Sequence, residues 1–236
     1  MRVDGLVLEL QRDAANPGAP LADTLRKVIM LGSDPRFAQL RAWARSELAG
    51  YDADSELPDY RRPTVALLVD CENGAWARTG QQISPESLPD VVRGKVTDAV
   101  PLAFRIGELE EMLRSARDTG QPVRLSVPHA QQVGQLMATE SGDPYLAITR
   151  VYWSVGAATL AGVLDHVRTT LAELLAAVSV HEESLSLRAA NGGAQGDATT
   201  GRDRWPLWVR WATVISALAG VAGAIAAVSQ WQGWGT

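Results

Sequence analysis

The sequence predicts an α+β fold, in which a mostly helical soluble domain with a small central sheet is followed by one C-terminal transmembrane helix. Apolar residues recur at helical spacing near the N-terminus and again in residues 160–178. Short runs rich in β-branched residues lie between these two regions. Near the C-terminus, about 18 uncharged residues lie between groups of tryptophans, a pattern typical of a membrane span.

Three short helices are predicted at the N-terminus. The first ends before a breaker at residues 16–18, the second stops at Gly32 and the third ends at Gly50. Asp34 is a candidate N-cap for the third helix, and Pro35 suits its first turn. The apolar stripes are Val3, Leu6, Val7, Leu10 and Ala14, then Leu21, Leu25, Val28 and Ile29, then Phe37, Leu40, Trp43, Ala44 and Leu48.

The middle of the chain changes to strand-like patterns. Residues 64–69 form an apolar run that contains β-branched residues. Apolar and polar residues alternate in residues 123–127, and residues 145–153 are again strand-like. These runs predict a small sheet. One helix is expected among the strands, ending near Gly120. Its apolar positions are Ile106, Leu109, Met112, Leu113 and Ala116.

The longest predicted helix covers residues 160–178 and should be the spine on which the other elements pack. Its apolar residues are Leu160, Val163, Leu164, Val167, Leu171, Leu174, Leu175 and Val178. After it, residues 188–204 are rich in Gly, Ala, Thr and Asp and predict a flexible tether with a reach of about 20–25 Å. The chain therefore divides into a domain at 1–187, a linker at 188–204, a span with its flanks at 205–231 and a short outer tail at 232–236.

The predicted span has the length and flanks of a transmembrane helix. Residues 211–228 would form a helix of about 27 Å, close to the thickness of a bilayer core. The alternative is a buried helix of a soluble core, which does not need aromatic residues at both ends. The interface anchors would be Trp205, Trp208, Arg210, Trp211, Trp231 and Trp234.

The charge flanking the span predicts its orientation. Arg202, Arg204 and Arg210 precede it and no basic residue follows, so the large domain should be cytoplasmic, on a single-pass protein of the cell inner membrane. Arg210 could snorkel to the lipid head groups or face a polar interior in an oligomer.

Small residues in the span permit close helix packing and hence a homo-oligomer, although such stripes also occur in monomeric anchors. The two stripes are Ala212, Ser216, Gly220 and Ala224, and Ala219, Gly223 and Ala227.

Composition limits the remaining classes of function. The 236 residues carry a formal charge of −5, which gives no general attraction to nucleic acid. The one cysteine, Cys71, cannot form an internal disulfide, which favours a reducing compartment. The first ten residues contain acids and lack the apolar core of a signal peptide.

Several segments in order resemble a known family, the AbiTii domain. The similarity covers about residues 3–180, more loosely in the middle third, and leaves the predicted span outside. The matching segments are LVLELQRDA at residues 6–14, LRK at 25–27, Trp43, Glu47-Leu48, Gly50-Tyr51, Leu57-Pro58-Asp59-Tyr60-Arg61, and GVLDHVRTTLAELL at 162–175.

The resemblance implies a role in phage defence, because the AbiTii name refers to abortive infection, in which a bacterium halts or kills the infected cell to limit phage spread. It supplies no mechanism, since a likeness of fold does not define chemistry.

Polar residues within the matching segments form a candidate cluster for a ligand or partner. Three roles stay open: paired charges that hold the helices together, a ligand site, or acid–base chemistry without a short motif. These residues are Gln11, Arg12, Asp13, Arg26, Glu47, Tyr51, Arg61, Asp165 and Arg168.

The common catalytic and phosphate-binding motifs are absent. The sequence contains no GxxxxGK[ST], GxGxxG, GxSxG, HExxH or CxxC. His129, His166 and His181 are far apart, and Glu72 beside Cys71 disfavours a reactive thiolate. We therefore predict no catalytic residue, metal or cofactor.

Three functional hypotheses follow. In the first, the protein is a membrane-anchored effector or sensor of antiphage defence, whose cytosolic domain controls oligomerisation of the span and disruption of the membrane. In the second, it is a membrane-tethered binding module or scaffold that recruits another defence protein. In the third, it is a membrane-tethered hydrolase with a carboxylate site. The expected partners are membrane lipid, other copies of the chain, and a defence protein or small signal.

Overall fold

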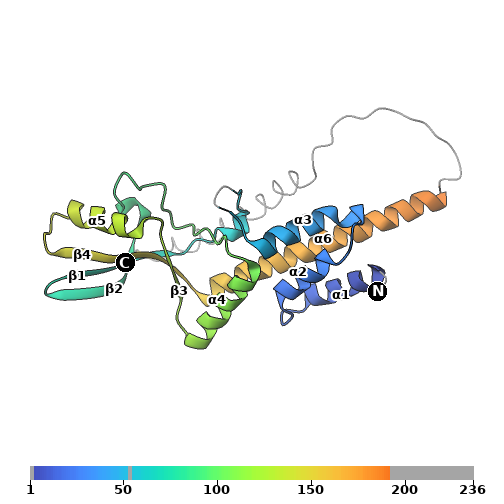
Figure 1. Ribbon diagram of the computed structural model, residues 1–236, viewed down its shortest axis with the longest axis horizontal. Coiled ribbons are helices and arrows are strands. Elements are labelled where there is room, and N and C mark those ends of the chain that lie inside the picture. Colours follow the sequence, from blue (N-terminus) through green and yellow to red (C-terminus); the bar gives the residue numbers. More distant parts are fainter. Residues whose placement is uncertain (1–2, 53–54, 192–236) are drawn as a thin grey trace, which may run out of the picture. The chain divides into compact units, whose positions relative to one another are not determined.

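The computed structural model describes residues 3–52 and 55–191, which form an α+β domain (Figure 1). This part of the chain contains six α-helices and a four-stranded antiparallel sheet. None of its helices is both long and apolar enough to cross a bilayer. The predicted span, its tryptophan and arginine anchors and the outer tail lie outside the described residues and stay predictions.

The three predicted N-terminal helices are confirmed. They are α1 (Val3–Ala15), α2 (Leu21–Ile29) and α3 (Ala38–Ala49). Asp34 accepts a hydrogen bond from the backbone N–H of Arg36 at 2.9 Å, but the turn that it caps is the 3-10 helix η1 (Pro35–Phe37), which precedes α3. Asp34 therefore begins a short turn and not α3 itself.

The sheet has the strand order β2-β1-β4-β3, and every neighbouring pair is antiparallel. The strands β1, β3 and β4 correspond to the predicted runs. The sequence does not predict β2, because that strand is exposed along almost its whole length and has no alternating apolar pattern. The bounds are Ala66–Asn73 for β1, Trp76–Ile83 for β2, Val123–Ser126 for β3 and Leu146–Val155 for β4.

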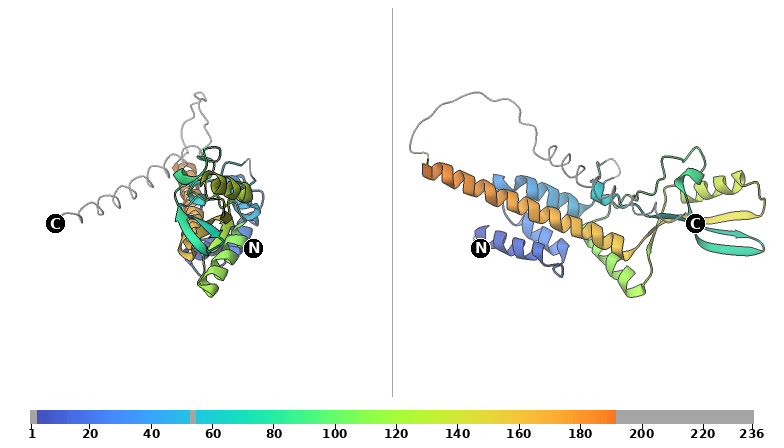
Figure 2. Two further views of the ribbon diagram at one scale, coloured as in Figure 1. Left: turned by 90° about the vertical axis from the view of Figure 1, so that its left-hand side faces the viewer. Right: turned by 180° about the vertical axis from the view of Figure 1, so that it is seen from behind.

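A second unpredicted element, helix α5 (Ala130–Glu140), packs on one face of the sheet (Figure 2). Gly134 allows the close approach, because a Cβ atom there would lie 3.0 Å from the carbonyl oxygen of Ile148. Ile148 pairs with Cys71 of β1, so the Cys71 side chain lies on the α5 side of the sheet. Strand alternation then places the neighbouring Asp70 on the opposite face.

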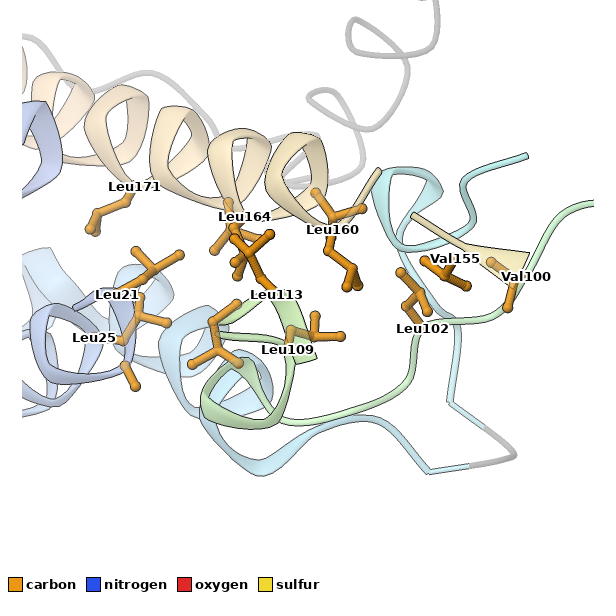
Figure 3. Close-up of a cluster of buried hydrophobic side chains, with 14 of the residues drawn as sticks. Leu21, Leu25, Val100, Leu102, Leu109, Leu113, Val155, Leu160, Leu164 and Leu171 are labelled. Carbon is orange, nitrogen blue, oxygen red and sulfur yellow. The ribbon is translucent and has the colours of Figure 1, made fainter. Parts of the chain in front are cut away.

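The core is built along α6 (Ala157–Asn191), as the predicted spine. Buried leucines of α6 face leucines of α2 and of α4 (Ile106–Thr119), as Figure 3 shows. Each buried leucine contributes about 1.5–3 kcal/mol relative to an exposed one. The leucines are Leu160, Leu164 and Leu171 of α6, Leu21 and Leu25 of α2, and Leu109 and Leu113 of α4.

The ends of α4 and α6 differ in how well the sequence predicts them. α4 ends at Gly120, which has the left-handed φ of 65° expected of a helix C-cap. α6 runs to Asn191, past residue 188 where the tether was expected to begin. Residues 187–190 are Leu-Arg-Ala-Ala, which favour helix, and the first glycine pair follows only at 192–193. The rest of the predicted tether lies outside the described residues.

We predict that Leu109→Ala lowers the free energy of unfolding of the domain by about 3 kcal/mol, because it leaves a cavity between α4 and α6. Urea denaturation of the full chain, followed by far-ultraviolet circular dichroism, measures the effect. The matched control is Leu136→Ala on α5, where the side chain is 38% exposed and the loss should be below about 1 kcal/mol. Equal losses at the two positions would contradict the assigned core.

Candidate functional site

The structure places the candidate polar residues in separate environments. Glu47, Tyr51 and Arg61 meet in a buried network, whereas Asp13 and Arg168 lie at the loop between α1 and α2. Gln11 and Arg12 are exposed on α1, and Asp165 is exposed on α6. Arg26 forms an exposed ion pair with Asp23 of its own helix. These residues therefore do not form a single binding site.

An ion pair between Arg61 and Glu47 is the centre of the buried network. Both side chains are 0% exposed. Arg61 Nη2 donates to Glu47 Oε2, while Nη1 donates to the carbonyl oxygens of Leu102 at 3.2 Å and Phe104 at 3.0 Å. The pair thus joins α3, the 3-10 helix η2 (Asp59–Arg61) and the segment that leads into α4.

Two tyrosines complete the coordination of the Glu47 carboxylate. The hydroxyls of Tyr51 and Tyr60 each donate to Glu47 Oε1 at 2.6 Å, and the indole N–H of Trp43 donates to the Tyr60 hydroxyl at 3.2 Å. Burial, followed by the nearby Glu47 charge, raises the pKa of both phenols. Both hydroxyls therefore stay protonated at neutral pH and remain donors.

The backbone around Gly50 makes this arrangement sterically possible. Gly50 ends α3 with φ 81°, and a Cβ atom there would lie 2.9 Å from the carbonyl oxygen of Ala103. The next residue, Tyr51, donates its backbone N–H to the same oxygen at 2.9 Å. On the other side, the Tyr60 ring stacks on His166 of α6 with centroids 4.8 Å apart. These contacts enclose the network and connect α3, η2 and α6 within the domain.

Two charged side chains clamp the loop between α1 and α2. Arg168 of α6 donates to the carbonyl oxygens of Asp13, Asn16 and Ala19 at 2.9–3.1 Å. Glu110 of α4 accepts the backbone N–H of Leu21 at 2.5 Å, at the first turn of α2. A cation at the end of α1 and an anion at the start of α2 both complement the helix dipoles.

The sequence reveals only half of this clamp. Arg168 lies in a segment that matches the AbiTii pattern, whereas Glu110 was not singled out. The available signal was Pro20, which precedes α2 and has no capping side chain, so the first amides of α2 need an acceptor from elsewhere. Lys27 was also missed as a partner of Asp13. It bridges Glu9 and Asp13 at 2.5 and 2.7 Å, and these hydrogen bonds raise the pKa of its ammonium group.

A groove of about 850 Å³ lies beside the clamp, between the α1–α2 loop, α4 and α6. Leu113, Ala161 and Leu164 contribute apolar surface, while Asp165 and Arg117 add charges of both signs. Such a lining suits a ligand or a peptide segment that has both donors and acceptors. The groove is the place where two candidate residues, Asp165 and Arg168, border open space.

A further polar group, around Asp70 and Tyr152 of the sheet, was not predicted. Asp70 is 6% exposed and Tyr152 is 3% exposed. The signal in the sequence was Asp70, an acid between the apolar residues Val69 and Cys71, since buried acids require partners. Within residues 3–52 and 55–191, no group of three histidines, cysteines or acids is placed to hold a metal ion.

A protein-family model matches most of the chain. The AbiTii family model matches residues 5–189, which include most of α1, all the elements from α2 to β4, and most of α6. No curated protein and no solved structure is significantly similar to the chain.

We predict that Glu47→Gln destabilises the domain by about 3–5 kcal/mol, because it leaves the Arg61 charge buried without a counter-ion. Urea denaturation of the full chain measures the loss. The control is Asp23→Asn, which breaks an ion pair whose two side chains are 63% exposed and should cost less than about 1 kcal/mol. A loss at Glu47 no larger than at Asp23 would contradict the role of the buried pair.

We also predict that Arg168→Met loosens the α1–α2 loop, because three carbonyl oxygens lose a charged donor while the aliphatic stem is kept. The cost should be about 1.5–3 kcal/mol. Hydrogen exchange measured by mass spectrometry should show faster exchange in peptides covering residues 13–22. The control, Arg117→Met, removes an exposed arginine of the same groove and should leave this exchange unchanged. If both variants exchange alike, Arg168 does not hold the loop.

Proposed function

The chain belongs to the AbiTii family, and from this premise we propose that it acts in abortive-infection defence against phage. The observation that carries the proposal is the family match, which covers residues 5–189 and so nearly the whole described domain. The proposed mode of action is based on the described contacts and on the C-terminal sequence.

We propose that the domain is the controlling part of a membrane-anchored effector. The C-terminal segment at residues 205–231 has the composition of a single span, and its small residues favour packing of several copies in lipid. With the domain on the cytoplasmic side, activation would bring the spans of a homo-oligomer together and disturb the inner membrane.

The control would act through α6. This helix contributes Leu164, Asp165 and Arg168 to the groove and then leads along the chain towards the C-terminal segment. A small signal or a partner segment bound in the groove would contact Arg168 and so act on the same helix. We therefore propose a sensory role for the groove and a structural role for Glu47, Tyr51 and Arg61. We assign no catalytic step to the domain.

The scaffold hypothesis also has support from one observation. Trp76 is 41% exposed and Tyr145 is 75% exposed, and both lie at the same end of the sheet, since Asn73 pairs with Trp76 and with Leu146. Exposed aromatic residues of this kind are common at protein interfaces. In this second proposal the span only anchors the domain at the membrane, and the domain recruits another defence protein.

A membrane-potential measurement separates the two proposals. Bacteria that express the full chain are challenged with phage and followed with a voltage-sensitive dye, beside a variant in which residues 205–231 are replaced by an unrelated single span. We expect depolarisation with the native span alone, because only that span carries the packing residues. Gly220→Leu should also reduce depolarisation, since a bulky side chain prevents close helix approach.

The outcomes lead to different conclusions. Protection without depolarisation, retained by the chain with the unrelated span, would contradict the effector proposal and favour the scaffold. Absence of protection from phage with every version, although the chain is expressed and folded, would count against the defence role itself. A matched control is Ala222→Leu, which introduces the same leucine side chain into the span outside both small-residue stripes.

A further inference from the structure

Asp70 lies where the sheet is irregular on both sides of β1. The pairing with β2 shifts between Val69 and Cys71, and the pairing with β4 shifts between Asp70 and Cys71. Gly80 of β2 has φ 68° and donates its backbone N–H to Asp70 Oδ1 at 2.8 Å. Thr149 of β4 donates its hydroxyl to the Asp70 carbonyl oxygen at 3.1 Å. The two irregularities thus fix the position of one carboxylate, as bulges often do near functional sites.

Tyr152 is fixed by the same carboxylate. Its hydroxyl donates to Asp70 Oδ1 at 3.0 Å, and its side chain is buried. Register places Tyr152 opposite Leu68 of β1 and opposite Ser126 of β3, on the face of the sheet that α5 does not cover. The ring is therefore a rigid platform on that face.

Arg124 of β3 lies over this platform with its donors open. Its guanidinium carbon is 5.2 Å from the centre of the Tyr152 ring, and Nη1 is 4.0 Å from Asp70 Oδ2, too far for a hydrogen bond. The side chain is half exposed. In the described part of the chain, the guanidinium donates to no hydrogen-bond acceptor. Stacking on the Tyr152 ring therefore holds the planar guanidinium in one orientation before any anion binds.

A second arginine lies on the same face. Arg150 of β4 pairs with Asp70 across the strands, two residues from Tyr152, and is exposed. Ser154, on the other side of Tyr152, pairs with Arg124. Two guanidinium groups and small hydroxyls thus surround one buried carboxylate whose Oδ1 already accepts two hydrogen bonds. The two guanidinium charges exceed the single charge of Asp70, while the exposed Glu72 lies two residues further along the same face of β1.

We propose that this surface, formed by Arg124, Arg150, Ser126 and Ser154 around Tyr152, binds the phosphate group of a small soluble ligand. A phosphate has several oxygens and up to two negative charges, so it can engage both guanidinium groups, whereas a carboxylate is satisfied by one. This inference goes beyond the proposed defence role, because it depends only on the sheet and not on the groove or the C-terminal segment.

Isothermal titration calorimetry of the full chain with inorganic pyrophosphate tests the proposal. We expect binding that weakens as salt is raised, and a loss of about ten- to hundredfold in affinity for Arg124→Gln, which removes one charged fork. Arg45→Gln removes the same charge from the exposed face of α3 and should bind as the unchanged protein does. Arg124 is exposed, so its replacement should leave the melting temperature unchanged.

Tyr152→Phe separates orientation from charge. This substitution keeps the ring beneath Arg124 and leaves the net charge of the protein unchanged, but it removes the hydrogen bond to Asp70. The affinity for pyrophosphate should therefore fall by less than it does in Arg124→Gln. The proposal is overturned if pyrophosphate does not bind, or if Arg124→Gln and Arg45→Gln weaken binding equally. It is also overturned if the surface binds only vesicles containing phosphatidic acid and not pyrophosphate, because the site would then recognise lipid.

Discussion

The packing of the helical part depends on the need of the buried Arg61 guanidinium for acceptors. An arginine with no solvent exposure must find partners for its charge, and here they come from Glu47 of α3 and from the carbonyl oxygens of Leu102 and Phe104. An arrangement that separates these segments would leave a charge unpaired in the interior. The ion pair therefore joins α3, η2 and the segment before α4, and removing one partner would leave a buried charge uncompensated. Trp43, Tyr60 and His166 extend the same constraint to α6.

Elements in which apolar residues recur at regular spacing could be predicted from the sequence. The first three helices, α4 with its Gly120 cap, and α6 each place apolar residues on one face, and that pattern arises from burial alone. The runs that predict β1, β3 and β4 are recognised by apolar residues that include Val and Ile. β2 and α5 could not be predicted in this way. β2 is exposed and pairs through its backbone, and α5 is held by a glycine contact with β4 that depends on the tertiary structure.

The candidate polar residues show that the sequence alone also does not identify which polar side chains meet in the folded domain. Resemblance singled out Glu47, Tyr51 and Arg61, but only their distances showed that they bind one another inside the domain. Arg168 was visible in the sequence, whereas its partner in the clamp, Glu110, lies far away along the chain and carries no local signal. Asp70 was overlooked because an acid in a strand is informative only once its partners, the Gly80 amide and Tyr152, are known.

The irregularity at Gly80 also bears on the solubility of the protein. β2 is an edge strand, and an exposed, regular edge can pair with the edge of another molecule and start aggregation. The left-handed backbone at Gly80 turns one amide inward to Asp70 and interrupts the row of groups that a foreign strand would need. Arg78, which stacks on Trp76, adds a charge to the same edge. The carboxylate that shapes the sheet surface thereby also disfavours intermolecular β-pairing at the β2 edge.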